Sequence, residues 1–98
     1  MAVAMLYEVP GLTREQYERI LTEVNKNGTP SGSLVHAAGP IDDGYRIIEV
    51  WESPQAADAF YESAEYHAAT ANLNTEPKIL MTWPVEGLNA GSGWAPVI

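Results

Sequence analysis

Hydrophobic and polar residues alternate with two different periods along the chain, and the changes of period mark out its elements. Alternation with a period of two predicts strands over residues 2–9, 33–38, 45–51 and 78–83. A period near 3.6 predicts one helix after Thr13 and a second after Ser53 that continues to about Leu73. This βαββαβ order predicts an α+β fold of the ferredoxin-like type, with an antiparallel sheet and both helices on one of its faces.

Both predicted helices begin with residues that cap a helix start. Thr13 and Gln16 have the spacing of a capping box, and Ser53 is followed by Pro54 at the first helical position. An apolar stripe then runs along the first helix through Tyr17, Ile20, Leu21 and Val24. We expect this stripe to be plain core.

The hairpin formed by residues 33–51 has two faces of different character. One face carries His36, Tyr45, Glu49 and Trp51, and the other carries Val35, Ala37, Ile48 and Val50. We expect the helices to cover the second face, because it is apolar throughout. The first face would then stay open together with Val3, Met5, Tyr7, Leu34, Ile47, Met81 and Trp83. Such a large apolar patch predicts a homodimer, joined through the face that bears Ile47 and Glu49.

Length and charge restrict the classes of protein. The 98 residues suffice for one domain, which we expect over residues 1–86, followed by a tail over residues 87–98. This tail contains Trp94, and we expect it either to dock on the partner protomer or to fray. The formal net charge of −8 opposes binding to nucleic acid or to an anionic membrane. Without a basic leader or a long apolar run, cytoplasmic residence is the default expectation.

His36 and Glu49 are the first candidates for catalytic chemistry. If the hairpin is symmetric about Asp42 and Asp43, their side chains lie opposite each other on one face. A carboxylate that accepts from one imidazole nitrogen fixes the tautomer and raises the basicity of the ring. The other nitrogen would be free to take a proton from a substrate. The alternative interpretation is a structural polar pair that sets the register of the dimer.

Aromatic residues on the same face are candidates for substrate binding: Tyr7, Tyr45, Trp51 and Trp83. Their rings would sandwich a planar substrate, and the phenol hydroxyls would polarise a carbonyl group. They would alternatively fill a dimer interface. Tyr66 and His67 are further candidates, but neighbouring residues of a helix point about 100° apart, so at most one of them faces a cavity.

Three segments carry a resemblance to a known group of proteins: LVHAAGP, EVWESPQAADAF and ESAEYHAA. Together they resemble the dimeric α+β barrel superfamily, which includes the antibiotic biosynthesis monooxygenases. The resemblance implies a homodimer whose sheets face each other, with a small-molecule cavity in each protomer. The superfamily includes cofactor-free oxygenases for polycyclic phenols, haem-degrading enzymes, polyketide cyclases and muconolactone isomerases.

Several of these activities depend on residues that can be sought in the sequence. Haem-degrading relatives use an asparagine on the first strand, which the segment VAMLYEV lacks. Cofactor-free oxygenases tend to use a set of Asn, Trp, Tyr and Arg, of which Trp51 and several tyrosines are present. Arg46 lies on the other face of its strand, which we expect the helices to cover. Cyclases of the superfamily carry a late helical histidine that faces the cavity mouth, which makes His67 a second candidate base.

No cofactor or metal is expected. The chain has two histidines, no cysteine, no zinc-binding spacing and no phosphate-binding glycine motif. We therefore expect a cofactor-independent enzyme that abstracts a proton from a small, apolar carbonyl or phenolic compound of the polyketide kind, leading to cyclisation or isomerisation. A cofactor-free monooxygenase is the second interpretation, and a non-catalytic dimer that binds a small ligand is the third.

Overall fold

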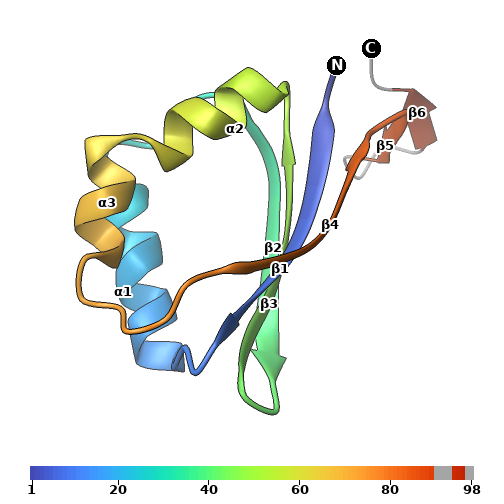
Figure 1. Ribbon diagram of the computed structural model, residues 1–98. Coiled ribbons are helices and arrows are strands. Elements are labelled where there is room, and N and C mark those ends of the chain that lie inside the picture. Colours follow the sequence, from blue (N-terminus) through green and yellow to red (C-terminus); the bar gives the residue numbers. More distant parts are fainter. Residues whose placement is uncertain (90–93, 97–98) are drawn as a thin grey trace.

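The computed structural model describes residues 1–89 and, as backbone, residues 94–96. Its helices are α1 (Arg14–Val24), α2 (Pro54–Tyr61) and α3 (Ala64–Thr70). Its strands are β1 (Val3–Pro10), β2 (Ser33–Ile41), β3 (Gly44–Trp51), β4 (Lys78–Pro84), β5 (Gly87–Asn89) and β6 (Trp94–Pro96). The first four strands form an antiparallel sheet in the order β2-β3-β1-β4 (Figure 1). This topology confirms the predicted ferredoxin-like α+β fold.

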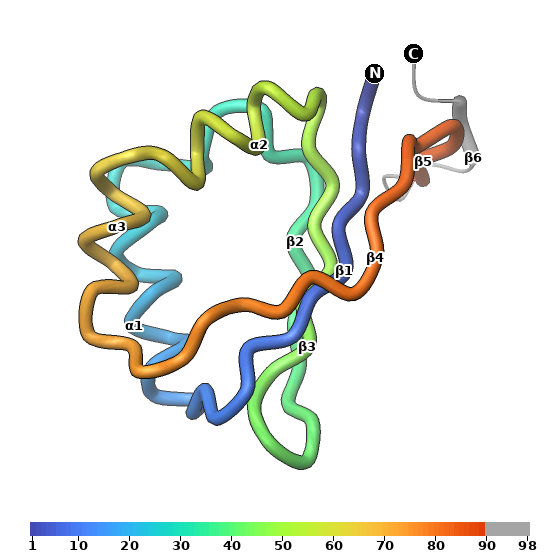
Figure 2. Tube along the Cα trace, in the orientation of Figure 1, coloured from blue at the N-terminus to red at the C-terminus, as the bar shows by residue number. Residues whose placement is uncertain are grey.

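The helices form one layer and the sheet forms the other (Figures 1 and 2). Helix α1 begins as predicted, because the Thr13 hydroxyl accepts from the Gln16 N–H at 3.2 Å and the Gln16 side chain accepts from the Thr13 N–H at 2.9 Å. Ser53 caps α2 by accepting from the Ala56 N–H at 3.1 Å. None of the described helices is long and apolar enough to cross a membrane.

The second helical segment is divided in two, so the prediction of one helix up to Leu73 is wrong. Ser63 interrupts it: its hydroxyl donates to the Phe60 carbonyl at 2.6 Å and accepts from the Tyr66 N–H at 3.2 Å. A serine that bonds nearby backbone groups in this way ends one helix and caps the next. In a continuous helix Tyr61 and Tyr66 would point about 140° apart. The break instead brings their rings into contact, with centroids 4.9 Å apart.

The helices cover the opposite face of the sheet from the one that the sequence pattern predicts. Tyr45, Ile47 and Glu49 point toward the helical layer and are buried. Because Ile47 and Glu49 lie inside the protomer, the prediction that they join a dimer is wrong. The hydroxyl groups of Tyr17 on α1 and Tyr61 on α2 explain why the helices cover this face. They form hydrogen bonds with His36 and Glu49, which point from it toward the helices.

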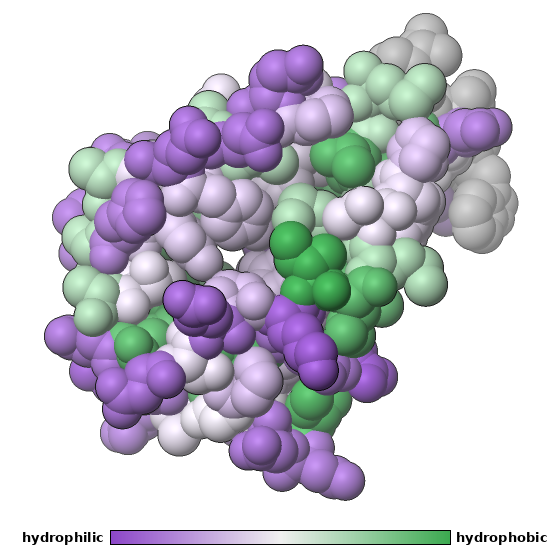
Figure 3. Space-filling model, in the orientation of Figure 1, coloured by the Kyte–Doolittle hydropathy of each residue, from purple (hydrophilic) through white to green (hydrophobic). Residues whose placement is uncertain are grey.

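The open face of the sheet carries the small and aliphatic residues of β1 and β3. Opposite Leu6 and Ala4 in β1 lie Met81 and Trp83 of β4, which are 57% and 37% exposed. The sequence pattern assigned these two residues to the face of Tyr7, but the pairing of β1 with β4 shifts between Leu6 and Tyr7 and reverses that assignment. Figure 3 shows hydrophobic side chains over β4 and hydrophilic ones over the helices.

The C-terminal segment folds back on its own protomer. Strands β5 and β6 pair as a small antiparallel ribbon, and Leu88 packs against a buried cluster that includes Ala2, Ala4 and Val50. This cluster lies on the open face of the sheet and covers one end of it. The Trp94 side chain and residues 97–98 lie outside the described part of the chain, so the docking of this tail on a partner stays a prediction.

Gly44 is the position where the hairpin depends most on a missing side chain. Its φ is +115°, and an added Cβ would lie 2.1 Å from the Val9 carbonyl oxygen. We therefore expect Gly44→Ala to lower the free energy of unfolding by about 2–3 kcal/mol. Gly39 is the matched control, because no atom of the described residues lies within 4 Å of an added Cβ and its φ is ordinary. Urea denaturation of both variants measures their free energies of unfolding. Equal losses for Gly44→Ala and Gly39→Ala would contradict the special role of Gly44.

Candidate functional site

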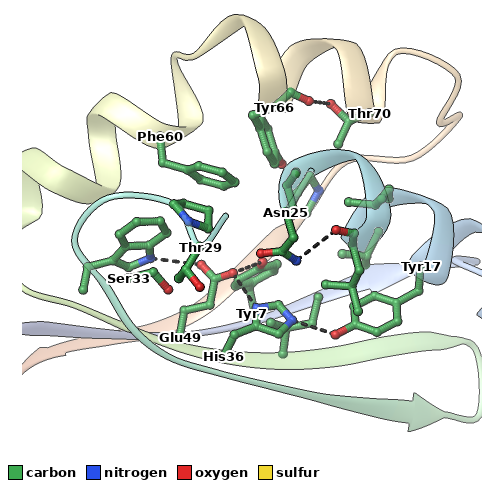
Figure 4. A pocket seen from close by; sticks show the side chains of 18 of the residues that line it. Tyr7, Tyr17, Asn25, Thr29, Ser33, His36, Glu49, Phe60, Tyr66 and Thr70 are labelled. Carbon is green, nitrogen blue, oxygen red and sulfur yellow. Dashed lines mark hydrogen bonds and ion pairs between the residues drawn. The ribbon is translucent and has the colours of Figure 1, made fainter. Parts of the chain in front are cut away.

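A cavity of about 280 Å³ lies between the sheet and the helical layer (Figures 3 and 4). Its walls are largely aliphatic and aromatic, and they include Val9, Leu12, Ile20, Leu21, Val24, Ile47, Phe60 and Leu73. Five of the polar side chains that line it gather around His36 and Glu49: Tyr7, Tyr17, His36, Glu49 and Trp51. The other polar lining residues lie elsewhere on the wall: Asn25, Thr29, Ser33, Tyr66 and Thr70. Few convergent polar groups in an apolar hollow are typical of a small-molecule site.

Glu49 is the centre of this polar group. Its side chain is buried, the residue being 6% exposed, and each of its two carboxylate oxygens accepts two hydrogen bonds. Oε1 accepts from Trp51 Nε1 at 3.1 Å and from the Tyr61 hydroxyl. Oε2 accepts from the Tyr7 hydroxyl at 3.1 Å and is 3.0 Å from His36 Nδ1. The carboxylate is therefore fully satisfied by the protein.

The strand register brings these partners together. His36 of β2 lies directly opposite Glu49 of β3, as the symmetry of the hairpin predicts. Trp51 follows two residues later on the same face of β3, and Tyr7 lies on the neighbouring strand β1. Tyr61 comes from α2, at the end of that helix. Three strands and one helix thus provide the carboxylate of Glu49 and the four hydrogen-bond donors around it.

The hydrogen bonds keep the carboxyl group of Glu49 ionised. Burial alone would raise its pKa, but hydrogen bonds from His36, Tyr61 and Trp51 outweigh burial and lower the pKa below its ordinary value. Burial and the nearby Glu49 charge raise the pKa values of Tyr7 and Tyr61. Both phenols therefore remain protonated and act as donors to the carboxylate.

His36 connects this charge to the cavity. Because Glu49 is ionised, we assign the hydrogen to Nδ1, which donates to Oε2, and leave Nε2 as an acceptor. The hydroxyl of Tyr17 lies 2.6 Å from Nε2 and donates to it (Figure 4). The expectation that Nε2 is free is therefore wrong. The reason is that Tyr17, expected to be plain core, directs its polar end at the histidine.

The structure brings together most, but not all, of the residues predicted for the site. Tyr7, His36, Glu49, Trp51 and Tyr66 line the cavity. Tyr45 is buried behind Tyr17 and does not line it. His67 is exposed on α3, because it points away when its neighbour Tyr66 points inward. Trp83 lies on the open face of the sheet. The catalytic and binding roles of all eight stay predictions.

Tyr17 and Tyr61 are the polar residues that the sequence reasoning missed. Tyr17 is the only residue with a hydroxyl in the apolar stripe of the first predicted helix, which is a signal that this stripe meets a polar group. Tyr61 gave no such signal, since its orientation depends on the break at Ser63. A tyrosine in an otherwise aliphatic stripe therefore indicates that its hydroxyl has a hydrogen-bond partner inside the protein, although the stripe alone does not identify that partner.

A second hollow of about 480 Å³ adjoins the cavity between α3 and β4. The two share five lining residues: Tyr7, Tyr66, Thr70, Leu73 and Pro77. Met5 and Ile79 add apolar surface to the second hollow. Tyr66 thus lies between the two spaces, and a ligand longer than one ring system would extend past it.

Solved structures of several proteins share this fold. A candidate antibiotic biosynthesis monooxygenase from Chloroflexus aurantiacus has a TM-score of 0.64 at 18% identity, over 93% of this chain and 100% of that chain. A protein of unknown function from Bacteroides thetaiotaomicron, described as a possible oxidoreductase, has a TM-score of 0.59 at 14% identity, over 84% and 95%. Protein YJCS has a TM-score of 0.61 at 16% identity, over 85% and 98%.

By contrast, comparison of the amino-acid sequence gave no match. No protein-family model matches the chain, and no curated protein matches it significantly. The structural likeness, at 18% identity or less, shows a shared fold. It supports the resemblance to the dimeric α+β barrel proteins at that level.

Replacing Glu49 tests the ionised carboxylate. Glu49→Gln places an amide N–H₂ against hydrogen-bond donors, so we expect it to lower the free energy of unfolding by about 2–4 kcal/mol at neutral pH. Because the folded pKa is lowered, this contribution is present above the ordinary value of 4.5 and is lost as the pH falls through the folded pKa. The difference between wild type and variant should therefore shrink below about pH 4.5.

Urea denaturation over a pH series measures this difference. Glu62→Gln serves as the control, since Glu62 is exposed and should give a small effect at every pH. A difference for Glu49→Gln that stays constant in acid would contradict a lowered pKa.

Proposed function

We propose that this protein is a cofactor-independent enzyme that abstracts a proton from a small planar carbonyl or phenolic compound. The observation that carries the proposal is the contact between His36 Nδ1 and the buried, ionised Glu49 at the wall of an apolar cavity. The geometry is that of a general base oriented by a carboxylate. The abstraction would lead to cyclisation or isomerisation.

The cavity favours a neutral substrate of modest size. A space of about 280 Å³ corresponds to roughly nine water volumes, enough for a molecule of one or two rings. The aliphatic and aromatic walls favour an apolar body, and the net charge of −8 disfavours a substrate that arrives as an anion. The adjoining hollow beyond Tyr66 gives room for a substituent.

Glu49 and His36 have different tasks in this reaction. Glu49 is an unsuitable base, because it is buried and both of its oxygens are occupied by donors. It orients the imidazole and stabilises the imidazolium that forms when His36 accepts the proton. The electron pair of the broken C–H or O–H bond stays on the substrate as an enolate or phenolate. An enolate can then attack a second carbonyl of the same molecule or take back a proton at another carbon.

A cofactor-free monooxygenase is the second candidate. It is favoured by the fold shared with the candidate antibiotic biosynthesis monooxygenase from Chloroflexus aurantiacus. The same proton abstraction would start it, since an enolate can reduce O₂ directly, with the balance R₂CH₂ + O₂ → R₂C=O + H₂O. Oxygen consumption separates the two reactions. A non-catalytic binding protein would show neither proton abstraction nor oxygen uptake.

Hydrogen exchange on 2-tetralone, a two-ring ketone with acidic C–H bonds, tests the base. In D₂O, wild-type protein should accelerate the exchange of these hydrogens, as followed by NMR. His36→Gln should lower the catalysed rate by about 100-fold or more, which is the usual contribution of a general base. His67→Gln is the matched control, because His67 does not line the cavity. No exchange by wild type, or full activity of His36→Gln, would overturn the proposal.

We also propose that the protein is a homodimer joined through the open face of its sheet. Leu6 and Ile48 lie on this face beside the exposed Met81 and Trp83. A second copy would bury these apolar residues, in the manner implied by the resemblance to the dimeric α+β barrel proteins. The cavity then lies within each protomer, on the other side of the sheet from the interface.

Two substitutions on β4 test which face is buried. Met81→Asp should raise the dimer dissociation constant by about 100-fold or more, because a carboxylate in an apolar interface loses its hydration. Ile79→Asp is the matched control: Ile79 is 59% exposed but pairs with Tyr7, on the helical side of the sheet. Sedimentation or light scattering measures the dimer dissociation constant of each variant. A monomeric wild type at micromolar concentration, or equal effects of both variants, would contradict the interface.

A further inference from the structure

The hydroxyl of Tyr17 occupies the position from which a substrate would reach His36. It lies 2.6 Å from Nε2, while Nδ1 is engaged by Glu49 at 3.0 Å, so both ring nitrogens of His36 have a partner. Tyr17 itself lines the cavity. We propose that Tyr17 is a catalytic residue that takes the proton from the substrate while it passes its own hydroxyl proton to His36. This inference rests on the proposed function and extends it.

Three contacts position Tyr17 beside His36. Its ring stacks on that of Tyr45, with centroids 4.8 Å apart and planes at 20°. It also lies nearly parallel to the His36 ring, at 12° and 6.0 Å. The backbone N–H of Tyr17 donates to the Thr13 carbonyl at 2.9 Å, within the capped first turn of α1. With the ring held in this way, the hydrogen bond to His36 Nε2 sets the direction of the hydroxyl, as a proton relay requires.

The relay moves two protons and leaves Tyr17 unchanged. The substrate C–H bond breaks, its electron pair stays on the substrate as an enolate, and the proton goes to the Tyr17 oxygen. At the same time the Tyr17 O–H bond breaks and its proton goes to His36 Nε2. The products are a neutral Tyr17, an imidazolium paired with the Glu49 carboxylate, and the enolate. Return of a proton through Tyr17 to another carbon of the enolate completes an isomerisation and restores the neutral imidazole.

The environment of Tyr17 favours a relay over a stored tyrosinate. Burial raises the pKa of its phenol, and the neighbouring Tyr45 and the Glu49 charge raise it further. Tyr17 therefore stays protonated at rest and loses its proton only as it gains another. The positive charge that appears during the reaction resides on His36, next to the Glu49 carboxylate that stabilises it, and the negative charge resides on the enolate.

Tyr17→Phe tests the relay in the 2-tetralone exchange assay. We expect the catalysed rate to fall by about 30-fold or more, with the affinity for 2-tetralone changed less than about threefold. Tyr45→Phe is the matched control, since it keeps the stacked ring and its hydroxyl takes no part in the hydrogen bonds around Glu49 and His36. If Tyr17 only covers Nε2, its removal would leave the rate unchanged or raise it, which would overturn the inference.

A proton inventory on wild type gives a second test that needs no variant. Release of tritium from 2-tetralone labelled at its acidic C–H bonds is measured in mixtures of H₂O and D₂O, because the solvent does not return this label to the substrate. Transfer of the Tyr17 hydroxyl proton in the same step makes the rate depend on the deuterium fraction of the solvent, whereas direct transfer to His36 does not. A rate independent of that fraction overturns the relay. Loss of activity in His36→Gln alongside full activity of Tyr17→Phe would remove the relay but keep the proposed function.

Discussion

Hydrogen bonds around the buried carboxylate of Glu49 connect the sheet to the helical layer. An ionised carboxylate away from water costs several kcal/mol unless hydrogen bonds replace its hydration. Here Tyr7, His36, Trp51 and Tyr61 supply four donors from three strands and one helix. Each donor has to approach at a particular angle, so the carboxylate fixes the register of the sheet and the position of α2 together.

The same requirement decides which face of the sheet the helices cover. A purely apolar face would have packed against the helices without polar partners, yet the helical tyrosines have hydroxyl groups that need acceptors. Pairing Tyr17 with His36 and Tyr61 with Glu49 satisfies both sides. The small and aliphatic residues are consequently left on the outer face, where Leu88 covers one end of the sheet.

A polar centre between the layers also explains why they enclose a hollow. Large rings hold the helices away from the sheet, and their contacts with each other leave the space above Glu49 unfilled. The cavity thus combines an apolar wall with one oriented imidazole and one phenol. This combination suits proton abstraction from a substrate held in an apolar hollow, and it depends on both layers rather than on a local motif.

Local sequence patterns suffice to predict the order of the first five elements, the starts of α1 and α2, the opposition of His36 and Glu49, and their shared face with Tyr7 and Trp51. These features follow from local rules: capping chemistry and the period of two in a strand. Contacts between distant segments determine which face the helices cover, that Tyr17 meets His36, and that Met81 and Trp83 turn outward. A period of two separates two faces without saying which one is buried, because that choice depends on partners from distant segments.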